Sequence, residues 1–137
     1  MADGYLTAAM AGLRAALVAD AGVAALVADR VVDEPRENIA FPYIRFGRIA
    51  PVPDDTDGTL GMALTIGLEC HSRPVAGRIE AARLCEAVAD ALHRQPEALS
   101  VAGFNVIEIE VQTWALDRLP DGAGYIGRLA FELRLDR

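Results

Sequence analysis

Two cysteines and two histidines are the residues of this 137-residue chain that could carry out nucleophilic chemistry. Cys70 directly precedes His71, and Cys85 and His93 follow within a predicted helix. An activated thiolate needs an imidazole within hydrogen-bond reach of its sulfur. Successive residues of a strand point to opposite faces, so we expect Cys70 to enter the core and His71 to lie on the polar face beside Glu69. A thiol hydrolase remains an alternative, but this geometry disfavours it.

The same residues are poorly spaced for a metal ion. Cys85 and His93 are eight positions apart, which places them about 80° apart around a helix. Zinc sites usually contain closely spaced ligand pairs, and the chain has no such pair of cysteines or histidines. We therefore expect neither a metal ion nor a cofactor, and no catalytic residue.

One acidic run resembles part of a calcium-binding loop. Asp55, Asp57 and Gly58 fit the middle of that pattern, which begins with Asp and ends with Glu six residues after the glycine. Here the first position is Pro53 and the last is Leu64. The run is better interpreted as part of a polar loop, over residues 50–59, that projects into solvent or toward a partner.

The composition narrows the class of protein further. The net charge is −7, and all 13 basic residues are arginine. Tight binding of a nucleic acid backbone requires clustered cations, so this charge disfavours it. No uncharged run approaches the roughly 18 residues that a membrane-spanning helix needs, and the N-terminal residues lack the pattern of a signal peptide. The chain is expected to be one soluble domain over residues 1–137, not exported by a signal peptide and with no membrane partner.

Apolar spacing predicts two main helices. Leu6, Met10, Leu13 and Leu17 form one stripe of a first helix, for which Asp3 is an available cap. A short helical turn is expected over 23–28. A second amphipathic helix follows Ser72, which we expect to be its cap, and its apolar stripe runs from residue 81 to residue 92.

Alternation of apolar and polar residues predicts the strands. We expect short strands over 30–33 and 99–101, and longer ones over 42–49, 60–70, 104–114 and 125–135. Along 104–114, Ile107, Ile109 and Val111 should point inward. The fold class is therefore α+β, a mainly antiparallel sheet of four to six strands with two helices packed on one face.

The outward face of this sheet carries charges of both signs. It should present the side chains of Glu69, His71, Glu108, Glu110, Arg128, Glu132 and Arg134. Cross-strand ion pairs on a solvated face are one interpretation. The other is a contact between subunits, because charged strand faces can fix the register of a heterologous interface that closes into a ring.

Four stretches in order give the chain a resemblance to a known family. They are Arg30 to Asp33 with Pro35 and the run Ala40 to Gly47; Cys70-His71-Ser72-Arg73; the helix from Gly77 to His93; and Asp121-Gly122 followed by Tyr125, Gly127 and Leu129-Ala130-Phe131. Together they resemble the tail-completion, or tail-terminator, proteins of long-tailed phages and gene transfer agents. The resemblance covers roughly residues 5–135, and the Ala- and Arg-rich style favours the gene-transfer-agent branch.

This resemblance implies a structural role and carries no catalytic residues. The implied protein forms a ring, usually of six copies, on the end of the tail tube and joins it to the head-neck stopper protein. It ends polymerisation of the tail tube protein and leaves a channel through which DNA passes without specific binding. Its implied location is the tail-neck junction of a virion or virus-like particle, assembled in the bacterial cytoplasm.

An acidic subunit would give such a channel a repulsive or neutral lining. Asp54, Asp55, Asp57, Glu108 and Glu110 are our candidates for a surface that faces the lumen or a partner. The arginines Arg45, Arg48, Arg128 and Arg134 are our candidates for contacts between subunits. A monomeric protein-binding module remains the third alternative, beside the thiol hydrolase.

Overall fold

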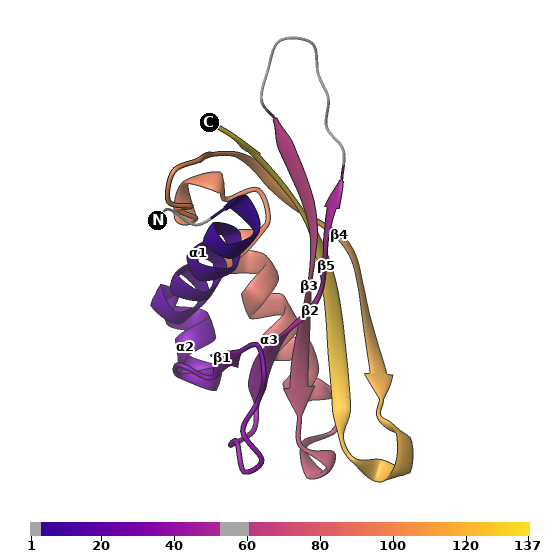
Figure 1. Ribbon diagram of the computed structural model, residues 1–137. Coiled ribbons are helices and arrows are strands. Elements are labelled where there is room, and N and C mark those ends of the chain that lie inside the picture. The colour runs from indigo at the N-terminus through magenta and orange to yellow at the C-terminus, as the bar shows by residue number, and fades with distance from the viewer. Residues whose placement is uncertain (1–3, 53–60) are drawn as a thin grey trace.

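The computed structural model describes residues 4–52 and 61–137, and in this part of the chain three α-helices cover one face of a five-stranded sheet (Figure 1). The helices are α1 (Tyr5–Ala19), α2 (Ala21–Val27) and α3 (Gly77–Leu92). The strands are β1 (Val31–Val32), β2 (Tyr43–Val52), β3 (Met62–Ser72), β4 (Asn105–Arg118) and β5 (Tyr125–Asp136). The predicted α+β class is confirmed, and the expected helical turn after the first helix is a helix of its own, α2.

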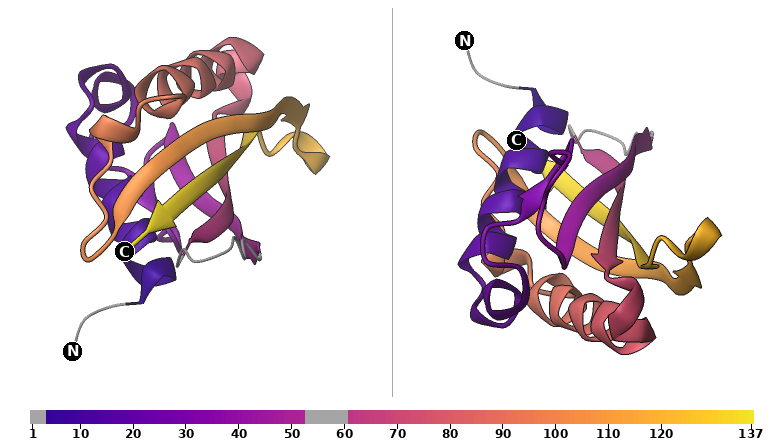
Figure 2. Two further views of the ribbon diagram at one scale, coloured as in Figure 1. Left: turned by 90° about the horizontal axis from the view of Figure 1, so that it is seen from above. Right: turned by 90° about the horizontal axis from the view of Figure 1, so that it is seen from below.

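The strand order is β1-β2-β3-β5-β4. Every neighbouring pair is antiparallel except β1 with β2, which pair in parallel over two residues. The sheet is strongly twisted when seen along its strands (Figure 2). All three described helices lie on one side of the sheet, and none of them covers its second face (Figure 1). We call this second face the open face.

The first two helices form a bent pair at one end of the helical layer. Leu13 and Leu17 of α1 are fully buried, as the apolar stripe predicts, but Leu6 is exposed because it lies in the first turn, beyond the main core. Gly4 is the residue before α1, and Asp3, the expected cap, lies outside the described residues. The helix α2 has its own cap, because the side chain of Asp20 accepts a hydrogen bond from the backbone N–H of Val23 at 3.0 Å.

No single helix within residues 4–52 and 61–137 has both the length and the apolar character to cross a bilayer. The pair α1 and α2 passes that test only when the two are taken together, and their axes are bent by 85°.

The corner between β3 and α3 corrects one expectation. Ser72 is the last residue of β3 and does not cap α3, because a 3-10 helix over Pro74–Ala76 intervenes and α3 begins at Gly77. The Ser72 hydroxyl instead donates to a carboxylate oxygen of Glu80 at 3.0 Å, and the Arg73 guanidinium binds the other oxygen at 2.7 Å. The corner is therefore closed by a side chain from the first turn of α3.

Strand β4 is longer than the alternation predicts and contains two bulges. The register passes from Val106 opposite Leu135 to Glu108 opposite Arg134, so Ile107 is an extra residue. Ile107 is 53% exposed, which corrects its expected inward position, and Val106 packs against the core in its place. A second shift between Val111 and Thr113 changes the alternation again. Ile109 is fully buried, as expected.

The expected strand over 99–101 is wrong. Residues Pro96–Ala98 form a 3-10 helix, and Val101 makes only an isolated bridge with Phe104. Leu99 and Val101 are nevertheless buried, because this connection packs its apolar side chains beneath the helices.

One hydrophobic core joins the helices to the sheet. Its largest fully buried side chains are Leu13, Leu17, Ile44, Leu64, Ile66, Leu68, Leu84, Leu92, Ile109, Leu129, Phe131 and Leu133. Alternate residues of β3 and β5 supply half of this list, as period-two alternation predicts. The core leaves the open face and the second half of β4 as the surfaces on which function can be sought.

Candidate functional site

The two cysteines form a buried pair between β3 and α3. Their thiols are hydrogen-bonded to each other, and both are free rather than disulfide-bonded. This hydrogen bond, together with burial, raises the pKa of Cys70 well above its ordinary value. The same bond, in which the sulfur of Cys85 is the acceptor, lowers the pKa of Cys85. The pair therefore behaves as part of the core, with Cys85 the more acidic of the two thiols.

The two histidines are held by other groups, and neither is hydrogen-bonded to a thiol. His71 lies on the open face, where its ring stacks on Tyr43 at 4.8 Å and its Nε2 lies 3.0 Å from a carboxylate oxygen of Glu69. It is more buried than its predicted place on a polar face suggests. The Nδ1 atom of His93 accepts a hydrogen bond from the backbone N–H of Val111 at 3.0 Å.

No group of three or more potential metal ligands comes together within residues 4–52 and 61–137. The acidic candidates Asp54, Asp55 and Asp57 lie outside the described residues.

The register brings three charged residues into one row across the open face. Arg45 of β2 lies opposite Glu69 of β3, and Glu69 lies opposite Arg128 of β5. The guanidinium of Arg45 also contacts Glu34 at 3.9 Å, and that of Arg128 contacts Asp117 at 3.1 Å. The row therefore alternates in sign from strand to strand, which cross-strand pairing favours.

A second charged cluster lies toward the other end of the open face. Glu108 is paired across strands with Arg134, and Glu110 lies opposite Glu132. The proximity of Glu110, through a shared hydrogen bond and charge repulsion, raises the pKa of Glu108. Arg134 binds Glu132 at 2.8 Å and Arg94 approaches Glu110 at 3.6 Å. Two of the expected lumen-facing residues, Glu108 and Glu110, are thus neighbours, and they are coupled electrostatically.

A shallow groove separates these two charged regions. Small residues from four strands lie along it, namely Gly47, Gly67, Thr113 and Ala130, with Arg48 beside them. A side chain at Gly67 would contact the backbone of Arg48 at 3.2 Å, so β2 and β3 approach closely at the β2 bulge. The candidate inter-subunit residue Arg48 is exposed at this bulge, on the edge of the groove.

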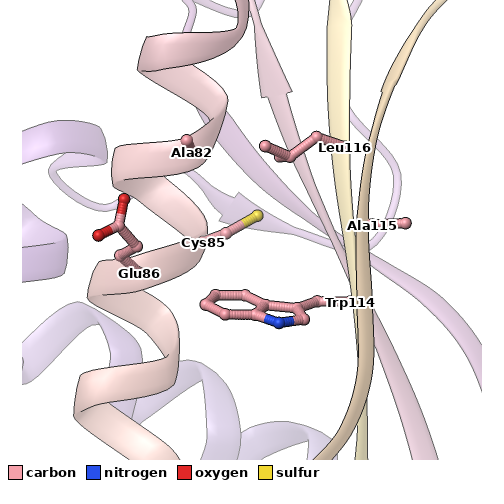
Figure 3. A pocket seen from close by; sticks show the side chains of 6 residues that line it. All are labelled: Ala82, Cys85, Glu86, Trp114, Ala115 and Leu116. Atoms are coloured by element: carbon pink, nitrogen blue, oxygen red, sulfur yellow. The ribbon is translucent and has the colours of Figure 1, made fainter.

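The helix side of the sheet has a second hollow, which we call the α3–β4 pocket. Its volume is about 530 Å³, and it lies between α3 and the second half of β4. Figure 3 shows the side chains of Trp114 and Leu116 directed from β4 toward α3, with the sulfur of Cys85 directed back toward β4. Ala82, Glu86 and Ala115 complete the lining. Trp114, the one tryptophan of the chain, is 53% exposed at this place.

Two arginines lie beside this pocket on the ring of Tyr125. The guanidinium carbon of Arg78 is 5.6 Å from the ring centroid and that of Arg118 is 5.7 Å from it, distances typical of cation–π contacts. Tyr125 is the cross-strand partner of Arg118. Within the part of the chain that the structure describes, neither arginine forms an ion pair with a carboxylate. We call these two residues the arginine pair.

Sequence reasoning did not identify the α3–β4 pocket or the arginine pair. The expected strand ended at Trp114, whereas β4 continues to Arg118 and thereby brings Leu116 beside α3. The alternation of Trp114, Leu116 and Arg118 with Ala115 and Asp117 was a signal for this extension. The bulge before Thr113, which sets the direction of these side chains, has no marker such as glycine in the sequence.

Comparison with known proteins identifies a family and solved structures of similar fold. The sequence profile described as "Tail completion protein gp17" matches residues 11–136. A chain in a structure titled "Virion of native gene transfer agent (GTA) particle" is similar in fold, with a TM-score of 0.87 and 22% sequence identity, over 99% of this chain and 100% of that one. No curated protein sequence matches significantly.

Proposed function

The chain belongs to the family of tail completion protein gp17, and from this membership we propose that it terminates the tail tube of a phage-like particle. Its general role is therefore that of a structural tail protein. In the proposed mechanism, several copies form a ring on the open end of the tube. The ring blocks the addition of further tube subunits and provides the surface to which the head-neck proteins bind. The observation that carries the proposal is the family match over residues 11–136.

The environment of the reactive side chains supports a role without catalysis. The thiol of Cys70 is buried and directed away from His71, which is stacked on Tyr43. Nucleophilic catalysis needs a base in hydrogen-bond reach of the nucleophile and space for a substrate beside both. Burial of Cys70 in the core provides no such space. We infer that binding between proteins, rather than bond formation, is the function of this molecule.

The open face supports self-association in a ring. In the proposed ring, Arg45, Arg48, Arg128 and Arg134 contribute to contacts between neighbouring copies. A heterologous contact repeated by rotation closes into a ring, and alternating charges fix its register. Six copies is the number that we propose.

The acidic residues have a separate proposed place. Glu108 and Glu110, with Asp54, Asp55 and Asp57 from outside the described residues, face the lumen or the neighbouring protein. The net charge of −7 favours a lining that does not hold the DNA phosphates, so DNA passes without specific binding. This arrangement belongs at the tail-neck junction of a gene transfer agent or a related particle.

The test is assembly with the cognate tail tube protein. Tube protein polymerised alone should give tubes of variable length. Addition of this protein during polymerisation should stop growth and add density at one tip, visible by electron microscopy. Cross-linking of the capped tubes followed by mass measurement should give a sixfold multiple of the 14.6 kDa chain. Tubes that grow equally long with and without the protein, and that carry no added density, would reject the proposal.

A further inference from the structure

The second half of β4 combines three features that together suit one kind of ligand. The main chain lies at an edge of the sheet, an apolar pocket lies beside it, and the arginine pair lies at one end of that pocket. Each feature comes from a different set of contacts.

The edge itself is free over residues 113–118. Among the strands of the described residues, β4 is the last in the order and pairs only with β5. At residues 109–111 its outer edge is covered, because the N–H of Arg94 donates to the carbonyl of Ile109 and the N–H of Val111 donates to His93. Further along the strand, the main-chain N–H and C=O groups of residues 113–118 that face away from β5 have no hydrogen-bond partner among the described residues. All six residues are exposed. Such an edge can pair with an extended segment of another chain.

The α3–β4 pocket supplies a site for an apolar side chain. Its walls are Trp114 and Leu116 from β4 and Ala82 and Cys85 from α3, and its volume of about 530 Å³ exceeds that of any single side chain. Leu116 is 39% exposed, so its side chain is available to a ligand. A strand added to β4 would lie beside this pocket, so its inward side chains would enter it.

The arginine pair supplies a site for a carboxylate. Two other arginines at this end of the sheet, Arg73 and Arg128, are already bound to Glu80 and Asp117. Arg78 and Arg118 are instead held on the Tyr125 ring, and this contact orients the guanidinium groups without using their N–H donors. Planar guanidinium groups that have donors to spare bind carboxylates strongly.

The spacing of the pocket and the pair sets a sequence requirement for the ligand. Leu116 and Arg118 are two residues apart in β4, so their side chains are on the same face, one strand period apart. A paired strand follows the same period. A side chain that enters the pocket is therefore followed or preceded, two residues away, by the side chain that reaches the arginine pair.

We propose that residues 113–118 of β4 bind an extended segment of a different protein of the particle, which pairs with this edge as an additional strand. The segment carries an apolar residue in the α3–β4 pocket and an aspartate or glutamate two positions away, bound by Arg78 and Arg118. The choice of a particle protein as the partner rests on the proposed function. The pairing of the edge with such a segment rests on the geometry of this chain alone.

A second copy of this chain fits the site less well. The opposite edge of the sheet is formed by β1 and by the part of β2 that β1 leaves uncovered. Neither β1 (Val31–Val32) nor β2 (Tyr43–Val52) contains an aspartate or a glutamate. Asp33 directly follows β1, but it lies in a bend, and β1 has only two residues. Edge pairing of a second copy along residues 113–118 would therefore have to use β2, which leaves the arginine pair without a carboxylate.

The binding of a defined peptide to the isolated protein tests the geometry. The probe is the acetylated and amidated peptide Thr-Val-Thr-Leu-Thr-Asp-Thr, together with its reversed sequence to allow for either strand direction. Emission from Trp114 should shift to shorter wavelength on binding, because the indole lines the pocket. A control peptide of the same composition, with Asp moved next to Leu, should bind about tenfold more weakly, because its carboxylate points to the other face.

Variants of the protein identify the side chains responsible. Arg118→Gln and Leu116→Ser should each weaken binding of the peptide about tenfold or more. Arg83→Gln removes an exposed charge of the same helix layer, and Ile107→Ser removes a 53% exposed apolar side chain of β4 outside the pocket. Both controls should bind as the unchanged protein does. Equal binding of the probe peptide and the control peptide would overturn the proposed geometry. Equal binding of the probe peptide to all four variants, or no binding at millimolar peptide, would also overturn it.

Hydrogen exchange in the assembled particle tests the partner. Those amides of residues 113–118 that face away from β5 should exchange at least about tenfold more slowly in the particle than in the free protein. A photo-cross-linking residue at Ala115 should then attach to an acidic extended segment of another particle protein. Unprotected amides, or attachment to a second copy of this chain, would overturn the choice of partner. If the protein still caps tubes in the assembly experiment with the tail tube protein, the proposed function stands and only this inference fails.

Discussion

Gly127, near the start of β5, is the residue that makes room for the packing of the two cysteines. A Cβ atom at this position would collide with the sulfur of Cys85 and would approach Leu116 at 3.1 Å and the Cβ of Cys70 at 3.6 Å. The absence of a side chain therefore makes room for the thiol pair beneath α3. The sequence analysis placed Cys70 in the core from alternation alone, but the proximity of Cys85 depends on the docking of α3, which no local pattern specifies.

Substitution of this glycine should be destabilising in a way that depends on Cys85. We expect Gly127→Ala to lower the free energy of unfolding by about 1–3 kcal/mol, because the added methyl group overpacks a filled site. The measurement is chemical denaturation followed by circular dichroism. In the background Cys85→Ala the same substitution should cost much less, since the colliding sulfur is gone. An equal cost in both backgrounds would show that Cys85 is not the obstacle.

The Glu108–Glu110 pair gives a prediction about pH. Glu110 raises the pKa of Glu108, so the folded protein binds a proton at Glu108 at a pH where the unfolded chain has released it. This contribution favours the folded state below the raised pKa and is lost as the pH rises through it. Glu110→Gln should move the pKa of Glu108 down toward its ordinary value, as measured by NMR titration of the side-chain carboxyl. An unchanged titration of Glu108 would contradict the coupling.

At the scale of elements, periodic patterns predicted well which segments are helices and which are strands. They predicted poorly the structure of the segments that connect them. The strands β3 and β5 are buried at alternate positions, so their sequence alone placed Leu64, Leu68 and Leu133 correctly in the core. The β4 pattern misled at Ile107, because a bulge moves one residue out of the alternation without any change in residue type. The helix cap expected at Ser72 failed because the serine belongs to a strand that continues up to the corner.

The short helix α2 should depend on its cap. Asp20 accepts the N–H of Val23 at 3.0 Å, and α2 has only seven residues, so few other bonds hold its first turn. We expect Asp20→Ala to lower the free energy of unfolding by about 1 kcal/mol. Asp90→Ala, at an exposed site on α3, is the matched control and should have a smaller effect. Thermal denaturation of both variants measures this difference. An equal loss of stability in the two variants would show that the Asp20 cap does not stabilise the protein.

At the scale of the whole molecule, the sequence was enough to predict the layered fold and the family. It predicted only part of the candidate site. The charged rows of the open face follow from alternation, so Glu69, Glu108 and Arg128 were assigned correctly to that face. The α3–β4 pocket combines residues separated by about thirty positions, and its direction depends on a bulge. Such a site can be recognised only after the helix and the strand are placed together.

The central claim is that the protein ends the growth of a tail tube by binding to its open end. The most direct measurement is the length of tails in particles made without this protein, observed by electron microscopy beside particles made with it. Our account predicts tubes of abnormal and variable length, not joined to filled heads, and restoration of normal tails when the protein is supplied. Tails of normal length joined to filled heads in its absence would contradict the account.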